Sequence, residues 1–227
     1  MSELVFRDDG RVITKSNFDP AMATLPIGWK HHVVGLDLGR NDPTAIVVVE
    51  DKCLPDGNDL GLRTRTVVFH ETVQLYSYTD IADFLVKRLA QLHAPKLAID
   101  ASGLGQPFSS VLTQAGVEHY AVTMTAGASL KQEGTKVSVA KNLLIENMAV
   151  GLETGALTIA DDLPQKQELV NEIASFEMKA TSAGNLVLDG GGKGHHADRA
   201  VALALAYLST THLRKQRFAA RKLTNWH

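Results

Sequence analysis

Three aspartates occupy positions where a carboxylate is unusual. Asp37 lies inside the apolar run VVGLDLG, Asp100 ends the short apolar run KLAID, and Asp198 begins the helical run in GHHADRAVALALAYL. Charged side chains rarely enter buried strands unless they are paired or bind a metal. Carboxylate oxygens are hard ligands that suit Mg²⁺ or Mn²⁺. Three such side chains brought together could hold two divalent cations and support phosphodiester hydrolysis by a metal-activated water.

Each aspartate also has a simpler explanation. Asp37 could accept hydrogen bonds from the turn amides at 39–41, Asp100 could cap the turn or helix that follows it, and Asp198 could be an N-cap or first-turn residue favoured by the helix dipole. Taken together these explanations are less attractive, because Asp37 and Asp100 both interrupt strands where alanine or valine would pack better. No Ser-His-Asp or Cys-His arrangement is evident.

Four further residues are secondary candidates. His195 and His196 precede Asp198 and could shuttle a proton or contact a phosphate, or they could be ordinary loop histidines. Lys193 in the loop GGGKG could contact a phosphate, although a solvated loop lysine is the more common situation. Asp42 could support Asp37 from the following turn, or could be an ordinary turn aspartate.

The elements expected to position these residues begin with three strands at His32–Leu38, Ala45–Glu50 and Arg65–Val73, which form an antiparallel meander. A helix capped by Ser77 or Thr79 follows and runs to about Leu92. The remaining expected elements are a strand at Lys96–Asp100, a helix from near Pro107 to Gly116, a strand at His119–Thr125, a helix from about Val137 to Glu153, a strand at Leu157–Ala160, a helix from Gln165 to about Phe176, a hairpin over Glu177–Thr181 and Asn185–Asp189, and a last helix from His196 to Leu213. This order predicts an α/β fold with a mixed sheet flanked by helices. The opening meander argues against a Rossmann fold.

The domain organisation predicted for the 227 residues is simple. Residues 1–30 are an extended lead-in, 31–213 one domain, and 214–227 a basic tail that is either a solvated extension or a phosphate-contacting arm. The net charge of −2 argues against a strong stand-alone nucleic-acid binder. The single cysteine, Cys53, excludes an internal disulfide and favours a reducing, cytoplasmic setting. No signal peptide or membrane-spanning apolar run is present in the sequence.

A family resemblance emerges from the motifs in their order. GLDLGRNDPTAIVVV, LAIDASGLGQPFSSVL and GHHADRAVALALAYL, with KNLLIENMAVGLETGALTIADDLPQKQELVNEIASFEMK between the last two, resemble the nuclease domain of phage terminase large subunits over His31 to Leu213. The resemblance implies a ribonuclease H-like fold and a two-metal site of Mg²⁺ or Mn²⁺ with Asp37, Asp100 and Asp198 as ligands. It also implies the cutting of concatemeric viral DNA in the host cytoplasm. The implied partners are double-stranded DNA and a packaging ATPase, portal or small terminase subunit, with no membrane.

The sequence departs from this family in one respect and leaves three different functions open. Terminase large subunits carry a packaging ATPase, but the sequence has no GxxxxGK[ST] motif. The chain is therefore expected to be an excised or separately encoded nuclease domain that cannot power DNA translocation by itself. GLDLGRNDPTA also resembles the phosphate loop of actin-like ATPases and sugar kinases, although the chain is short for their two lobes. The chain could also be a junction resolvase, or a non-enzymatic module for DNA binding or assembly.

Overall fold

Three long strands form the centre of the sheet. The computed structural model describes residues 3–15, 26–39, 43–103, 105–180, 186–189 and 197–213, of which 178–180 and 186–189 are described by their backbone alone. β3 (Gly28–Asp37) pairs antiparallel with β4 (Thr44–Cys53), which pairs antiparallel with β7 (Thr64–Val73). These runs are rich in valine and threonine, whose branched side chains favour strands. The predicted meander is confirmed.

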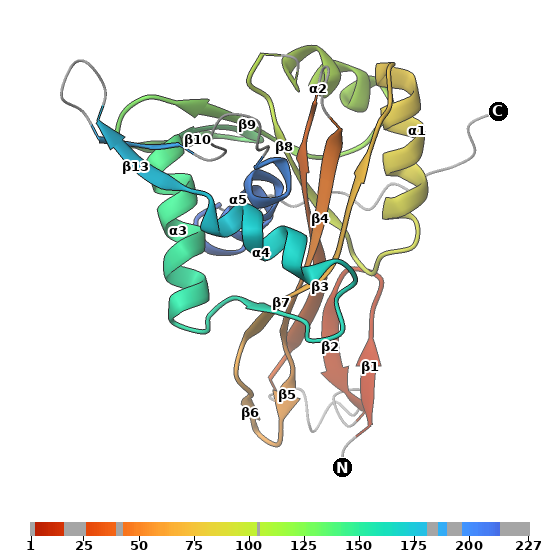
Figure 1. Cartoon of the computed structure of the whole chain (residues 1–227). Helices are drawn as coiled ribbons and strands as arrows, with labels where there is room; N and C mark the ends of the chain where they lie inside the picture. Colours follow the sequence, from red (N-terminus) through yellow and green to blue (C-terminus); the bar gives the residue numbers. More distant parts are fainter. Residues whose placement is uncertain are drawn as a thin grey trace.

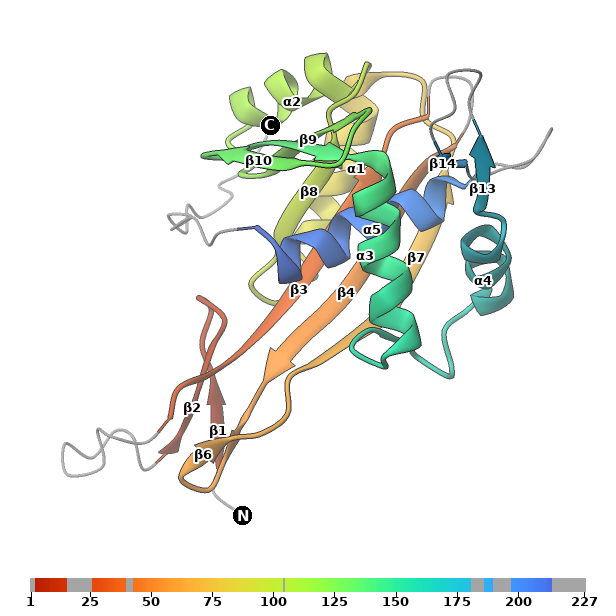
Figure 2. The same ribbon diagram turned by 90° about the vertical axis from the view of Figure 1, so that its left-hand side faces the viewer.

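Parallel strands extend the meander on one side. β8 (Lys96–Asp100) pairs parallel with β3, followed outward by β9 (Tyr120–Thr125) and β11 (Lys136–Ala140), also parallel, and by the antiparallel edge strand β10 (Leu130–Glu133). On the other side, the short β12 (Thr158–Ile159) pairs parallel with β7. The strand order is β10-β11-β9-β8-β3-β4-β7-β12 (Figures 1 and 2). The predicted mixed sheet is thus confirmed.

Helices cover both faces of this sheet. α1 (Tyr78–Leu89) and α2 (Gly105–Gln114) pack on one face, and the side chain of Ser77 caps α1 as predicted. α3 (Lys141–Glu153), α4 (Lys166–Ala174) and α5 (Asp198–Thr211) pack on the other face. Figure 2 shows α5 lying between the sheet and α3. Among the described residues, no helix is long and apolar enough to cross a membrane.

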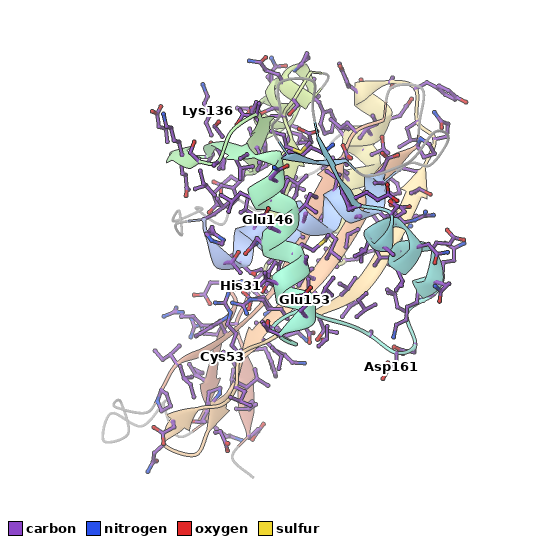
Figure 3. All side chains as sticks on the ribbon, turned by 60° about the vertical axis from the view of Figure 1, so that its left-hand side comes forward. His31, Cys53, Lys136, Glu146, Glu153 and Asp161 are labelled. Carbon is purple, nitrogen blue, oxygen red and sulfur yellow. The ribbon has the colours of Figure 1, made fainter. Side chains whose placement is uncertain are left out.

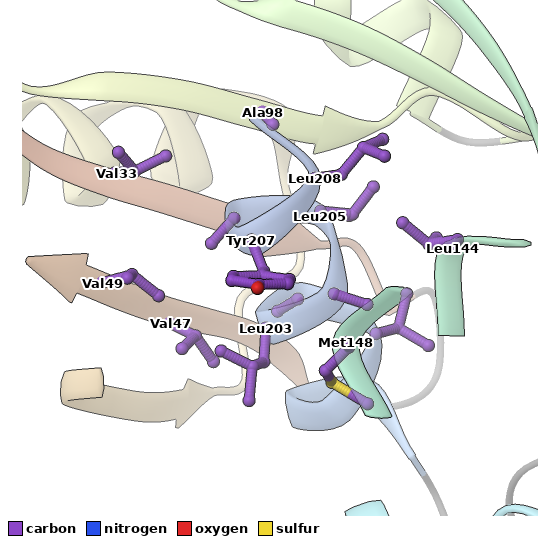
Figure 4. Close-up of a cluster of buried hydrophobic side chains, with 14 of the residues drawn as sticks. Val33, Val47, Val49, Ala98, Leu144, Met148, Leu203, Leu205, Tyr207 and Leu208 are labelled. Carbon is purple, nitrogen blue, oxygen red and sulfur yellow. The ribbon is translucent and has the colours of Figure 1, made fainter. Parts of the chain in front are cut away.

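The buried helix α5 lies unusually close to the sheet. Its alanines at 200, 202, 204 and 206 are fully buried, and small side chains allow close approach between helix and strand. A Cβ atom on Gly35 of β3 would collide with the carbonyl oxygen of Ala202. Leu203, Leu205 and Tyr207 fill the space between the sheet and α3 (Figure 4). The glycine and the alanine series therefore fix the height of α5 above β3.

The outer surface of α3 carries acidic side chains together with the exposed Val150. Glu146 and Glu153 are exposed on this helix (Figure 3), whereas Leu144, Ile145 and Met148 are buried toward α5. Farther down the sheet, the buried thiol of Cys53 donates a hydrogen bond to the carbonyl of Gly61 at 3.2 Å. This cysteine is free.

Two segments differ from their predicted structure. The helix expected from Val137 instead begins at Lys141, because Lys136–Ala140 forms β11 and buries Val137 and Val139 in the sheet. The predicted start of this helix was therefore wrong, because the residues just before Lys141 form a strand. The segment between β4 and β7, for which no strand was predicted, contains the short ladder of β5 (Pro55–Asp56) and β6 (Asp59–Leu60). The expected hairpin after α4 is present as β13 (Glu177–Ala180) and β14 (Leu186–Asp189).

The N-terminal lead-in contributes to the sheet. β1 (Leu4–Phe6) and β2 (Arg11–Thr14) form a hairpin, and β2 pairs antiparallel with the first residues of β3. This hairpin was not predicted, since the region shows no sustained periodicity. The boundaries at 30 and 213 stay predictions, and the tail 214–227 lies outside the described residues.

Candidate functional site

Strand alternation places two of the aspartates on the same face of the sheet. In β3, Val33 belongs to the core under α5 while Val34 and Leu36 belong to the core under α1 and α2. Successive side chains of a strand point to opposite faces, so Asp37 points to the α5 face. In β8, Ala98 lies in the α5 core and Ile99 in the opposite one, so Asp100 also points to the α5 face.

The strand register brings these two carboxylates side by side. β3 and β8 are parallel, with Val33 opposite Lys96 and Leu36 opposite Ile99. Asp37 and Asp100 each follow the last of these pairs, at the carboxyl ends of neighbouring strands. Both side chains are partly buried rather than sealed from solvent.

The third aspartate arrives on α5. Asp198 is the first residue of that helix and is partly buried. The N-cap residue is Ala197, and no side chain at the N-cap position bonds to the helix, so Asp198 is a first-turn residue and not the N-cap. The close packing of α5 against Gly35 holds Asp198, the first residue of the helix, near the end of β3.

Electrostatics shows that the three acids share one environment. Burial, followed by the charges of Asp100 and Asp198, raises the pKa of Asp37 from 3.8 to about 8, against a hydrogen bond from the backbone of Leu38. Glu172 of α4 adds a smaller contribution in the same direction. Burial is the largest cause of the raised pKa, and the smaller contributions of Asp100 and Asp198 put both acids within electrostatic reach of Asp37.

Asp100 combines this environment with a local turn. Its Oδ1 atom accepts a hydrogen bond from the backbone N–H of Ser102 at 2.7 Å, as the capping explanation expects. Burial nevertheless raises the pKa of Asp100 above its ordinary value, although hydrogen bonds from Ser102 lower it. The hydroxyl oxygen of Ser102 also accepts from the backbone N–H of Met124 on β9 at 3.0 Å, which ties the turn to the sheet.

A second glycine keeps this turn tight. A Cβ atom on Gly105, the first residue of α2, would collide with the carbonyl oxygen of Asp100. Gly105 thus lets α2 begin directly against the end of β8, as Gly35 does for α5 on β3. Sequence reasoning missed Gly35, Gly105 and Ser102 as supports of the site, since their importance depends on contacts between elements.

The described residues complete only part of the candidate site. Among them, no group of three or more His, Cys, Asp or Glu side chains is arranged to hold a metal ion as it stands. Within the same residues, no ion pair involves Asp37 or Asp100. The secondary candidates Asp42, Lys193, His195 and His196 lie outside the described residues, so their predicted roles stay predictions.

The chain is similar in sequence to a terminase large subunit. No family model matches the chain. The large subunit of the terminase of Thermus virus P23-45 is 26% identical over 181 residues, covering 78% of this chain and 31% of that protein. The chain therefore spans about a third of the length of this curated relative.

Solved structures give the same result for the fold. The large terminase nuclease from the thermophilic phage G20c with bound magnesium has a TM-score of 0.56 at 19% identity, covering 91% of this chain and 90% of that one. The same nuclease with bound cobalt has a TM-score of 0.55 at 20% identity over the same shares of the two chains. The predicted ribonuclease H-like fold and the predicted resemblance to terminase nuclease domains are both confirmed.

Proposed function

We propose that this protein is a divalent-metal-dependent endonuclease that cuts double-stranded DNA, with Asp37, Asp100 and Asp198 as the metal-binding residues. The observation that carries the proposal is the placement of Asp37 and Asp100 at the carboxyl ends of neighbouring parallel strands, on the sheet face that α5 covers, with the charge of Asp198 contributing to the raised pKa of Asp37. The fold shared with the terminase nuclease of phage G20c supports the same reaction, since that protein is described as a nuclease and binds magnesium or cobalt.

The donor set fits divalent cations in type and in charge. Clustered carboxylates repel one another, and their hard oxygen atoms are the ligands that Mg²⁺ and Mn²⁺ prefer. The partial exposure of all three side chains leaves them reachable from solvent. The fit concerns the donors and their charge, and not a finished coordination geometry, because the described residues alone do not form one.

The chain's own residues would hold and orient the reacting groups. When bound, divalent cations would supply a metal-activated water and stabilise the leaving oxygen. Asp37 must give up its proton to act as a ligand, because its raised pKa keeps much of it protonated near neutral pH. Asp198, at the start of α5, contributes its carboxylate from the electropositive end of a helix, which also favours phosphate binding.

The biological setting follows from the same similarity. We infer that the reaction is the cutting of concatemeric viral DNA during genome packaging, since the similar protein of Thermus virus P23-45 is a terminase large subunit. The inferred partners are double-stranded DNA together with a packaging ATPase, a portal or a small terminase subunit. A net charge of −2 is consistent with a nuclease held on DNA by such an assembly.

The test is cleavage of supercoiled plasmid in Mn²⁺ or Mg²⁺, followed on agarose gels. We expect nicked and linear products that disappear with a chelator and in the Asp37→Asn, Asp100→Asn and Asp198→Asn variants. Full activity in the double variant Asp37→Asn/Asp100→Asn would refute the assignment. Preferential cleavage of a four-way junction over linear duplex would favour a resolvase, and calorimetric binding of ATP would favour an actin-like nucleotide-binding protein.

A further inference from the structure

Arg199 connects the first turn of α5 to two other elements. This residue follows Asp198, and its side chain is only 16% exposed. Its Nη1 atom lies 2.6 Å from Oε1 of Glu172, and its Nη2 atom lies 2.6 Å from Oε2 of Glu168, both on α4. Nη2 also donates to the hydroxyl of Thr72 on β7 at 3.3 Å. The guanidinium thus joins α5, α4 and the sheet beside the acid cluster.

Glu172 has a second role that Glu168 lacks. Its Oε2 atom accepts hydrogen bonds from the backbone N–H groups of Arg199 at 2.7 Å and of Ala200 at 3.2 Å. The first N–H groups of a helix have no partner within that helix. Since Ala197 offers no side-chain cap, Glu172 caps α5 from a different helix, 28 residues before Ala200 in the sequence.

The contacts of Glu172 argue against direct metal binding. Its side chain is 13% exposed, and both of its oxygens are occupied, one by the guanidinium and one by the backbone of α5. An ion at this carboxylate would compete with the guanidinium of Arg199 and with the helix N–H groups for the same two oxygens. Glu172 forms an ion pair with Arg199, which Glu168 shares, whereas Asp37 and Asp100 form no ion pair among the described residues.

We propose that Glu172 is a positioning residue for the candidate site: it holds the first turn of α5 through the N–H groups of Arg199 and Ala200, and so fixes Asp198 relative to Asp37 and Asp100. The inference rests on the proposed function for the role of Asp198. The capping interaction itself does not depend on that function. Glu172 therefore acts on metal binding through Asp198, and not as a ligand.

The chain offers a matched control for this proposal. Glu168 pairs with the same arginine at the same distance, but it is 49% exposed and among the hydrogen bonds of the described residues it makes none to the backbone of α5. Comparing Glu172→Ala with Glu168→Ala separates the loss of an ion pair to Arg199 from the loss of the helix cap. Glu172→Gln retains an oxygen that can accept one backbone N–H and tests rescue of the cap without the charge.

Three measurements on the full chain are needed. Hydrogen exchange resolved by NMR reports on the amides of residues 199 and 200, electron paramagnetic resonance of free Mn²⁺ reports on metal binding, and plasmid nicking reports on activity. In Glu172→Ala we expect exchange at these amides to quicken by about tenfold or more. We expect the Mn²⁺ concentration for half-saturation to rise by about 10- to 100-fold, the effect typical of losing a group that orients a ligand. Glu168→Ala should change either quantity by less than about threefold, and Glu172→Gln should lie between the two alanine variants.

The outcomes separate this inference from the proposed function. Equal effects of Glu172→Ala and Glu168→Ala would overturn the inference, as would loss of Mn²⁺ binding with unchanged amide exchange, which would make Glu172 a ligand. If Glu172→Ala does not fold, the same comparisons are made with Glu172→Gln and Glu168→Gln. A wild-type chain that neither binds Mn²⁺ nor cuts DNA would sink the proposed function, and normal amide exchange in the Glu172 variants would then sink the cap as well.

Discussion

The β3–β4 ladder holds two partly buried carboxylates in opposite environments, Asp37 at one end and Glu50 toward the other. At one end, burial and the charges of Asp100 and Asp198 raise the pKa of Asp37 to about 8. Toward the other end, burial also acts to raise the pKa of Glu50, but the ammonium groups of Lys30 and Lys52, at 2.8 and 2.5 Å, outweigh it and the net shift is downward.

The contrast distinguishes an acid whose charge is paired within the fold from an acid that has other acids as neighbours. Glu50 has two cations within the fold, so its charge is satisfied by the chain. Asp37 has acids for neighbours, so its ionised form needs a cation from outside. Helix α5 runs along this ladder. Asp198 begins the helix near Asp37. Near the last residue of the helix, the carbonyl oxygen of Thr210 accepts a hydrogen bond from Arg63, which forms an ion pair with Asp51.

The largest expected difference between the two ends is in DNA cleavage. Asp37→Asn should lower the rate of Mn²⁺-dependent plasmid nicking by on the order of 1,000-fold, because a bound ion contributes several kcal/mol to the transition state and each 1.4 kcal/mol is about tenfold. Glu50→Gln should change the rate by less than about twofold, since Glu50 is satisfied by lysines away from the acid cluster. Initial rates on the same plasmid preparation give the comparison, and comparable losses in the two variants would break it.

The second prediction concerns stability without metal. The pKa of Asp37 in the folded chain, about 8, lies above its ordinary value of 3.8, so the folded state binds the extra proton between these values. The stabilisation by this proton is complete below about pH 4 and is lost as the pH rises through about 8. In a chelating buffer, Asp37→Asn should therefore be more stable than wild type at pH 8, on the order of a few kcal/mol, and nearly equal to it at pH 4.

Divalent cations should reverse the stability difference between Asp37→Asn and the wild type at pH 8. They bind the ionised carboxylates of the folded state only, so Mn²⁺ should raise the unfolding temperature of the wild type and leave that of Asp37→Asn much less changed. Calorimetric melts from pH 4 to 8, with chelator or with Mn²⁺, measure both effects. If Asp37→Asn is less stable than wild type at pH 8 in chelator, Asp37 is bonded locally as an ordinary turn aspartate.

The third prediction tests whether α5 must lie close to β3 to form the acid end. Gly35→Ala adds a methyl group that collides with the carbonyl of Ala202, so we expect a loss of about 1–3 kcal/mol in the free energy of unfolding. Gly61→Ala adds the same group where the nearest atom, the carbonyl oxygen of Leu54, is 3.3 Å away, and it should cost less than about 1 kcal/mol. Urea unfolding gives the free energy of unfolding of both variants. Equal losses in the two would mean that the contact between Gly35 and Ala202 does not limit the approach of α5 to β3.

The sequence predicted the elements that carry strong local signals. Strands such as β3, β4 and β8 are continuous apolar runs, and the acid within or at the end of a run marks Asp37 and Asp100 without any knowledge of the fold. The pairing of β3 with β8 was not predicted, and it is the parallel register of these strands that brings Asp37 and Asp100 side by side. The approach of Asp198 needed the family resemblance, since nothing in its own segment specifies which part of the sheet α5 covers.

The missed features depend on contacts between distant segments. β11 continues directly into α3 and no side chain caps that helix at Ala140, so the sequence carries no signal for the helix start. Glu172 lies on a polar helix, and only the packing of α4 against the first turn of α5 makes it a cap. Gly35 differs from an ordinary strand glycine only because Ala202 lies above it.

The smallest expected effect is at the paired end. The pKa of Glu50 is lowered in the fold, so its ionised form stabilises the protein above its ordinary pKa of 4.5, and that contribution is lost as the pH falls through the lowered value. Glu50→Gln should therefore cost about 1 kcal/mol at pH 7, typical of a solvent-accessible ion pair, with the difference shrinking toward zero in acid. This pH dependence is opposite in sign to that of Asp37→Asn. Urea titrations of both variants at pH 4 and pH 8 would show the two stability differences from wild type growing with opposite signs as the pH rises, and differences of the same sign would mean that the ladder holds its two acids in the same way.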